Sequence, residues 1–129
     1  MALTKEEAQS IVFSDMVAKL VKDGAQIKRE LTPEQADMLH MAVGVSGEAG
    51  ELLDAIKRYT IYQKELDLEN VIEELGDLEF FMERIRQLTG VTREQTLVAN
   101  IQKLGTRYSA GKYTNEQAQV RADKQELHS

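Results

Sequence analysis

Apolar residues recur every three to four positions along most of the chain, the spacing that is typical of amphipathic helices. The pattern predicts five helices, at residues 5–22, 33–60, 68–89, 93–107 and 115–127. No stretch has the character of a strand or of a flexible linker. Because the connections are short, consecutive helices are expected to pack antiparallel. The sequence therefore predicts a single all-α domain over residues 1–129, an antiparallel bundle of four main helices with a peripheral C-terminal helix or tail at 115–129.

Threonines mark the expected starts of the helices. In a capping box, the threonine oxygen accepts a hydrogen bond from the backbone amide three residues on, and a Glu or Gln there reaches back. That pattern occurs at Thr4, Thr32, Thr92 and Thr114. Pro33 suits a first helical position, where its missing N–H is not needed. Gly24 and Gly90 are expected to end the helices that precede them.

Composition narrows the classes of function. The net charge is -6 and there is no tryptophan, so neither a basic face for nucleic acid nor a base-stacking platform is expected. The absence of cysteine excludes disulfides and thiolate chemistry. The N-terminus lacks the apolar core of a signal peptide, and no run approaches the roughly 20 apolar residues that span a bilayer. We expect no membrane partner and a cytoplasmic protein, in the host cytoplasm if the gene belongs to a phage.

Two acidic tetrads lie within predicted helices, Glu48-Ala49-Gly50-Glu51 and Glu74-Leu75-Gly76-Asp77. Residues three apart share a helix face, so each tetrad directs two carboxylates the same way. Four carboxylates that converge between two helices would repel one another and resist burial. A divalent cation removes both problems, and carboxylate oxygens suit magnesium. The tetrads predict a metal-dependent enzyme that acts on phosphates.

Glu74 falls inside the apolar stripe of its predicted helix on a helical wheel. The stripe consists of Val71, Leu75, Leu78, Phe81, Met82 and Ile85. An uncompensated buried carboxylate is costly, so Glu74 needs a partner, a proton or a metal. A buried salt bridge to Lys or Arg of a neighbouring helix is the alternative to a metal site.

Four glycines, Gly44, Gly47, Gly50 and Gly76, lie within predicted helices around the tetrads. A glycine inside a helix costs roughly 0.5–1 kcal/mol relative to alanine. We expect them to allow close approach of helices or of a ligand around the carboxylates, and tight helix packing alone is the simpler explanation.

A cationic stripe follows one side of the fourth main helix. Asn100, Lys103 and Arg107 have the i, i+3, i+7 spacing of one face, and Lys112 follows in a loop with two tyrosines. Lys and Arg suit phosphate oxygens, and Asn suits a sugar hydroxyl or a base edge. The alternatives are a solvated basic face and an ordinary turn.

These motifs together resemble the MazG-like all-α nucleoside triphosphate pyrophosphohydrolases. The resemblance rests on Gly47-Glu48-Ala49-Gly50-Glu51-Leu52, Glu73-Glu74-Leu75-Gly76-Asp77, Ala99-Asn100-Ile101-Gln102-Lys103-Leu104, Arg107-Tyr108 and Gly111-Lys112-Tyr113, and spans roughly residues 32–122. It implies hydrolysis of (deoxy)nucleoside triphosphates to the monophosphate and pyrophosphate with Mg²⁺, for which Mn²⁺ can substitute. It also implies a role in nucleotide-pool control or house-cleaning.

The resemblance further implies roles for single residues. By position, Glu48, Glu51, Glu74 and Asp77 are the catalytic metal ligands, and one of the glutamates instead orients and deprotonates the attacking water. Asn100, Lys103, Arg107 and Lys112 are then nucleotide contacts. The implied assembly is a homodimer or a dimer of dimers, in which helices of one subunit complete the site of another.

Three other classes of protein compete with this interpretation. A ferritin-like di-iron protein would need Glu-x-x-His, and neither tetrad ends in histidine. A phosphoribosyl-ATP pyrophosphohydrolase would share the metal site and differ in its base and ribose pockets. A non-enzymatic helical interaction module would tolerate neutralised acids. The base and sugar preference, the number of metal ions and the choice between dimer and tetramer are left open by the sequence.

Overall fold

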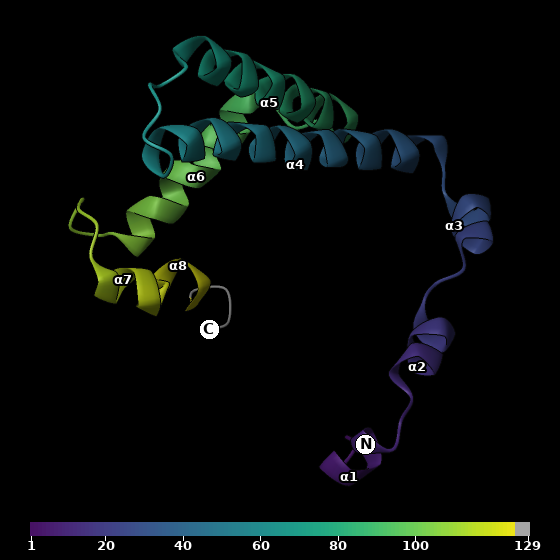
Figure 1. The fold of residues 1–129 in the computed structure, drawn as a ribbon. Helices are drawn as coiled ribbons and strands as arrows, with labels where there is room; N and C mark the ends of the chain where they lie inside the picture. Colours follow the sequence, from purple (N-terminus) through teal and green to yellow (C-terminus); the bar gives the residue numbers. More distant parts are fainter. Residues whose placement is uncertain (126–129) are drawn as a thin grey trace. The chain divides into compact units, whose positions relative to one another are not determined.

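The computed structural model describes residues 1–125, and every regular element in that range is a helix (Figure 1). The chain divides into two compact units, Met1–Ala36 and Asp37–Ser129. The first holds the short helices α1 (Lys5–Gln9), α2 (Phe13–Leu20) and α3 (Gly24–Glu30). The second holds most of α4 (Pro33–Thr60), together with α5 (Leu68–Thr89), α6 (Arg93–Arg107), α7 (Asn115–Val120) and α8 (Ala122–Gln125). The all-α prediction is confirmed.

The first unit departs from the predicted single helix over 5–22. The chain leaves the helix after Gln9 and starts again at Phe13. Gly24 was wrongly expected to end a helix, since it is the first residue of α3. The physical reason is Asp23, whose carboxylate accepts the Ala25 N–H at 3.1 Å and caps a new helix. The capping box of Thr4 and Glu7 is confirmed by its two reciprocal hydrogen bonds, of 2.8 and 3.2 Å.

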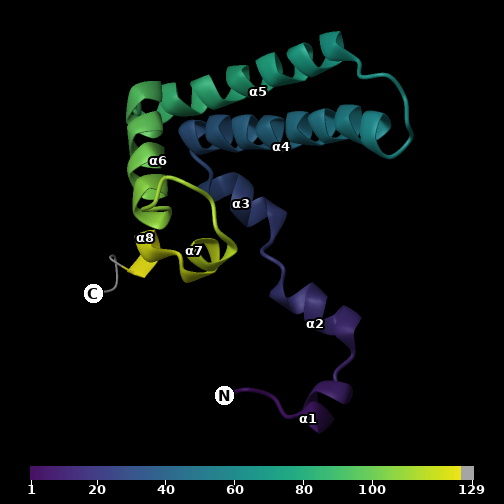
Figure 2. The ribbon, with the colours of Figure 1, turned by 90° about the vertical axis from the view of Figure 1, so that its left-hand side faces the viewer.

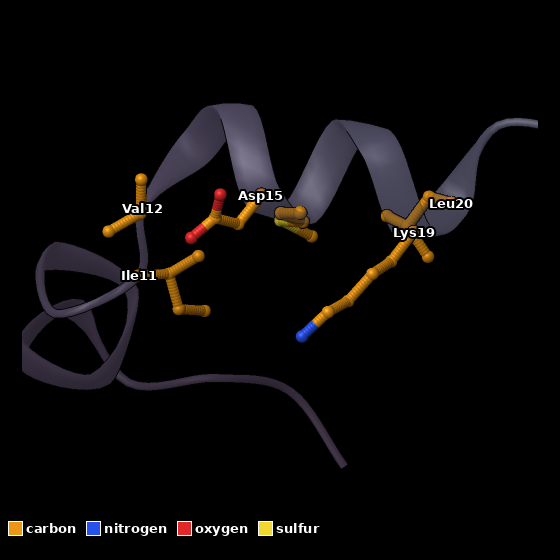
Figure 3. Close-up of a pocket in the computed structure, with 6 residues that line it drawn as sticks. Ile11, Val12, Asp15, Lys19 and Leu20 are labelled. Atoms are coloured by element: carbon orange, nitrogen blue, oxygen red, sulfur yellow. The ribbon is translucent and has the colours of Figure 1, made fainter.

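A cavity of about 390 Å³ lies within this first unit. Its lining consists of Ile11, Val12, Asp15, Met16, Lys19 and Leu20. Figure 3 shows Ile11 and Val12, which precede α2, beside Asp15, with Lys19 one turn further along the helix. None of the acidic or basic residues singled out from the sequence lines this cavity.

The second unit contains the three longest helices, and their predicted bounds are confirmed to the residue. Helices α4 and α5 lie side by side in both views (Figures 1 and 2). Residues with higher numbers on α4 contact residues with lower numbers on α5. Arg84 bonds Asp37 at 3.0 Å, Phe81 packs on Gly44, and Glu74 pairs with Glu48. The two helices are therefore antiparallel.

Gly90 ends α5 in the left-handed conformation, with φ 70°, as expected. Figure 2 shows α6 turning away at that point and running across the end of the α4–α5 pair. Helices α7 and α8 pack against α6. The helix predicted over 115–127 is interrupted at Arg121, which adopts φ 51°, and residues 126 and 127 lie outside the described part of the chain. The four-helix antiparallel arrangement stays a prediction.

Few side chains of the described residues are buried. Met41 and Ala55 are the buried apolar residues, and Glu74 is the buried charged one. Many large apolar side chains of the second unit remain exposed, among them Val43, Leu53, Ile72, Phe80 and Ile101. The single chain therefore leaves much of its apolar helix surface in contact with solvent.

Within residues 1–125, no helix combines the length and the apolar character needed to cross a lipid bilayer.

Candidate metal centre

Glu74 occupies the middle of the apolar face of α5, where only 9% of its surface is exposed. Val71, Leu78 and Phe81 on that face are half-buried, and Phe81 packs on Gly44 of α4. The expected burial of this glutamate is therefore confirmed. The Asp67 cap fixes the start of α5 and Gly90 fixes its end, so Glu74 lies within the regular part of the helix.

Three carboxylates from two helices converge at this point. Glu48 of α4 and Glu74 and Asp77 of α5 each offer one oxygen, and the three oxygens lie within 4.8 Å of one another. Glu74 and Asp77 share a face because they are three residues apart. The fourth predicted acid, Glu51, is exposed and lies outside this group. Two helices thus supply a three-oxygen cluster with Glu51 on its flank.

The cluster is electrostatically strained by its own charges. A hydrogen bond with Glu48 raises the pKa of Glu74 from 4.5 to about 7, with further contributions from burial and from the negative charges of Glu48, Glu51 and Asp77. Each of these influences on Glu74 disfavours its charged form, as expected where carboxylates face one another. The contribution of Glu51 places its carboxylate near the cluster even though it is not a member.

Within residues 1–125 the four acids form no ion pair, and Arg58 interacts electrostatically with Glu51. None of the ion pairs formed among residues 1–125 involves Glu48, Glu51, Glu74 or Asp77. The described residues thus form no buried salt bridge to Glu74. Carboxylate oxygens that converge from two helices without a cation of the protein are the donor set of a hard divalent ion. The residues present fit magnesium, and they also fit manganese.

The glycines around the cluster divide into two kinds. A Cβ at Gly44 would come within 2.4 Å of the Phe81 ring, so this glycine allows α4 and α5 to approach. A Cβ at Gly47, Gly50 or Gly76 would meet no atom within 4 Å. Close approach of helices inside the chain therefore explains Gly44 alone.

The cationic residues of α6 have different surroundings. Asn100 and Lys103 are exposed, and their side chains make no hydrogen bond or ion pair within the described chain. Arg107 donates to both carboxylate oxygens of Asp123, at 2.9 and 3.2 Å, and joins α6 to α8. The same contact raises the pKa of Arg107 and lowers that of Asp123. Within residues 1–125, no hydrogen bond or ion pair joins this stripe to the acidic cluster of the same chain.

Lys112 lies at the far end of α6, by a cavity of about 390 Å³. The lining comprises Ile101, Leu104, Gly105, Tyr108, Gly111, Lys112 and Tyr113. The rings of Tyr108 and Tyr113 are 5.5 Å apart and tilted. The structure therefore places Lys112 in an aromatic pocket, apart from Lys103.

Two features near these residues were not found from the sequence. A cavity at the loop end of α4 and α5 is lined in part by Arg58, Lys64 and Asn70. Asp123 was missed as the partner of Arg107. A sequence signal existed for Arg58, which stands four residues after Asp54 and donates to it from Nε at 2.9 Å. No local pattern indicates Asp123, because 16 residues separate it from Arg107.

Comparison with known families agrees with this geometry. The model of the MazG nucleotide pyrophosphohydrolase domain matches residues 36–111, which is more than half of the chain. The chain belongs to the MazG nucleotide pyrophosphohydrolase family. The match contains the three converging carboxylates and Glu51, and it begins at the boundary between the two units. Comparisons with curated proteins and with solved structures gave no significant match. Family membership supports nucleotide pyrophosphohydrolase activity in general.

Proposed function

We propose that this MazG domain hydrolyses nucleoside or deoxynucleoside triphosphates to the monophosphate and pyrophosphate in the presence of magnesium. The observation that carries the proposal is the convergence of oxygens of Glu48, Glu74 and Asp77 within 4.8 Å, without an ion pair to any residue of 1–125, inside the matched family domain. Nothing else in the described chain explains why three acids are held together.

Each acid has a proposed role. Glu48, Glu74 and Asp77 would hold the ion, since their oxygens already face one another across the two helices. Magnesium bound there would offset the charge of the phosphates and acidify a bound water. Glu51 lies outside the oxygen group but close enough to affect Glu74, so it is free to orient the attacking water and accept its proton.

Phosphoryl transfer depends on positioning and on neutralising charge. In the proposed reaction, water attacks the α-phosphorus, and the bond from that phosphorus to the oxygen bridging the α- and β-phosphates breaks. The bridging oxygen leaves with the electron pair as part of pyrophosphate. Lys103 and Asn100, whose side chains have no other partner in residues 1–125, are proposed to contact the nucleotide.

We also propose that the enzyme is a homodimer or a dimer of dimers whose sites combine residues of two subunits. The exposed apolar side chains of α4 to α6 support association with a second copy. Gly47, Gly50 and Gly76 support it as well, since open space within their own chain leaves room for a neighbour. The acidic cluster and the cationic stripe, which lack a contact within one chain, would then meet across the interface.

Product analysis tests the activity directly. The eight common ribo- and deoxyribonucleoside triphosphates are incubated with the enzyme and magnesium, and monophosphate, diphosphate, pyrophosphate and phosphate are quantified. Equal amounts of monophosphate and pyrophosphate from at least one substrate are expected. Release of orthophosphate and diphosphate instead would refute the proposed bond cleavage, and phosphoribosyl-ATP serves as the substrate that tests the related activity.

A further inference from the structure

The seam along which α4 and α5 face each other differs on the two sides of the acidic cluster. One turn toward the start of α4, the Phe81 ring lies on Gly44 so closely that a Cβ there would be 2.4 Å away. Beyond it, Asp37 and Arg84 bridge the helices at 3.0 Å. On the other side of the cluster, toward the loop between α4 and α5, the seam opens into a cavity of about 330 Å³.

This cavity, which we call the loop-end cavity, lies on the same helix faces as the carboxylates, toward the loop. It is lined by Ala55, Arg58, Lys64, Glu65, Asp67 and Asn70. Ala55 follows Glu48 by two turns of α4, and Asn70 precedes Glu74 by one turn of α5. Residues at these spacings share a helix face. The spacing along the two helix axes is therefore about 6 Å for Asn70 and about 10 Å for Ala55, the scale of a polyphosphate chain.

The chemistry of the lining favours an anion over a nucleoside. The ammonium group of Lys64 has no ion pair or hydrogen bond in the described chain, and neither has the side-chain amide of Asn70. Arg58 uses Nε and Nη2 for Asp54, which leaves the donors on Nη1. No aromatic residue lines the cavity, so a base would find no face to stack on.

The lining also holds two carboxylates, which formally balance the charges of Lys64 and Arg58, and Arg58 interacts electrostatically with Asp67. Asp67 caps α5, where one of its oxygens accepts the Asn70 backbone N–H at 3.0 Å. Glu65 is exposed and lies in the loop. In a polyphosphate bound to magnesium, the ion would already offset part of the negative charge. The donors of Lys64, Arg58 and Asn70 are therefore the groups left to bind a phosphate.

We propose that the loop-end cavity binds the two terminal phosphates of the substrate, the pair that leaves as pyrophosphate. The inference rests on the proposed function and extends it with the direction of the substrate along the seam. As the bond to the α-phosphorus breaks, negative charge builds up on the departing oxygen and its diphosphate. Lys64 and Arg58 stabilise that charge, and the Asn70 amide donates a hydrogen bond to a phosphate oxygen.

The test compares the two products as ligands. Binding of pyrophosphate and of nucleoside monophosphate is measured by titration calorimetry with magnesium, for the wild-type protein, Lys64→Ala and Lys64→Arg. Lys28→Ala is the matched control, because Lys28 is an exposed lysine of α3 without an ion pair in the described chain. Lys64→Ala is expected to weaken pyrophosphate binding about tenfold and to leave monophosphate binding unchanged. Lys64→Arg is expected to retain most of the affinity.

Other outcomes refute the inference. Unchanged pyrophosphate binding in Lys64→Ala, or wild-type protein that does not bind pyrophosphate, means that the cavity is not its site. Weakening of monophosphate binding alone means that the nucleoside end lies there. Failure of the proposed function has a separate signature, since it is the absence of pyrophosphate release by the wild-type enzyme. Circular dichroism of each variant tests whether the helical fold is retained.

Discussion

The Phe81 ring of α5 rests directly on the backbone of Gly44 in α4, at a separation that leaves no room for a Cβ. Gly44→Ala should therefore force the ring or the helices apart. Overpacking of this kind costs about 1–3 kcal/mol, and the gain in helix propensity from alanine offsets part of it. We expect a net loss in the free energy of unfolding, measured by urea denaturation at fixed protein concentration.

Gly76→Ala is the matched comparison, since a Cβ at this position meets nothing within 4 Å of its own chain. In an isolated chain it should stabilise the helix by roughly 0.5–1 kcal/mol. If both substitutions stabilise the protein equally, the packing of Phe81 on Gly44 is not what keeps position 44 a glycine. A loss at Gly76 would indicate close approach of a second copy.

Glu74→Gln should remove the activity while the fold is kept. The amide keeps the shape of the side chain and a hydrogen-bond acceptor, but it is a poor ligand for a hard cation. We expect turnover to fall at least about 100-fold, because loss of a direct ligand should exceed the effect of losing a supporting residue. Pyrophosphate release is measured alongside circular dichroism and thermal melting with and without magnesium. Retained activity, or an unchanged rise of Tm with magnesium, would remove Glu74 from the metal centre.

The raised pKa of Glu74 predicts how the metal-free protein responds to pH. The pKa is about 7 in the folded protein against an ordinary 4.5, because Glu74 shares a hydrogen bond with Glu48, is buried and faces other carboxylates. The folded state therefore binds this proton more tightly than the unfolded state. The resulting stabilisation is present at low pH and is lost as pH rises through about 7.

Thermal melting in a chelator should accordingly show Tm falling between about pH 4.5 and pH 7 and levelling off above that. Magnesium should reduce that fall, since it stabilises the ionised cluster, and its binding should release protons below about pH 7. Glu74→Gln has no proton to lose at this position, so it should lack this component of the fall. A wild-type curve that matches that of Glu74→Gln at every pH would contradict the assignment.

The fold was predictable where local signals agree with one another. Helices α4, α5 and α6 were predicted to the residue because Pro33, the Thr92 capping box and Gly90 fix their ends. The first unit was not, because α1 and α2 are separated by three residues without a proline or glycine, and Asp23 starts a helix where Gly24 suggested a stop. Short helices that bury nothing carry too weak a periodic pattern to be divided correctly.

The part of the candidate site that lies within one helix was predictable from the sequence, and the part that depends on two helices was not. Helical spacing places Glu74 with Asp77 within one helix, and the apolar stripe indicates burial. The rotation of α4 about its axis relative to α5 decides which of its two glutamates faces the cluster, and helical spacing does not reveal that rotation. Glu48 joins the oxygen cluster and Glu51 does not. The loop-end cavity depends on the path of residues 61–67, for which the sequence offers no periodic pattern.

Arg107 has a structural partner as well as a proposed role in binding the nucleotide. Its bidentate contact with Asp123 joins α6 to α8, and both side chains are largely buried. If Arg107 serves only as this anchor, Arg107→Ala and Asp123→Asn should lower Tm to a similar degree and leave KM unchanged. If it also contacts the substrate, Arg107→Ala should raise KM and Asp123→Asn should not. Steady-state kinetics and melting of the two variants separate the roles, and Lys124→Ala is a neighbouring control on α8.

A composite site can be tested by mixing subunits that are inactive for different reasons. Glu74→Gln damages the acidic cluster, and Lys103→Glu reverses a charge of the cationic stripe. If each site takes its acids from one subunit and its lysine from the other, a mixed dimer carries one intact site and one with both defects. Equal mixing after reversible dissociation then makes half of the dimers mixed, so about a quarter of the wild-type activity should return.

The control for this experiment mixes Glu74→Gln with Glu48→Gln, whose carboxylates belong to the same cluster of one chain. A mixed dimer of that pair has a damaged cluster in both subunits, so no activity should return. Light scattering must show that the mixtures have the size of the wild-type oligomer. Recovery in the control as well would indicate exchange of whole helices between subunits. No recovery in the first mixture would mean that Lys103 acts within its own chain or not at all.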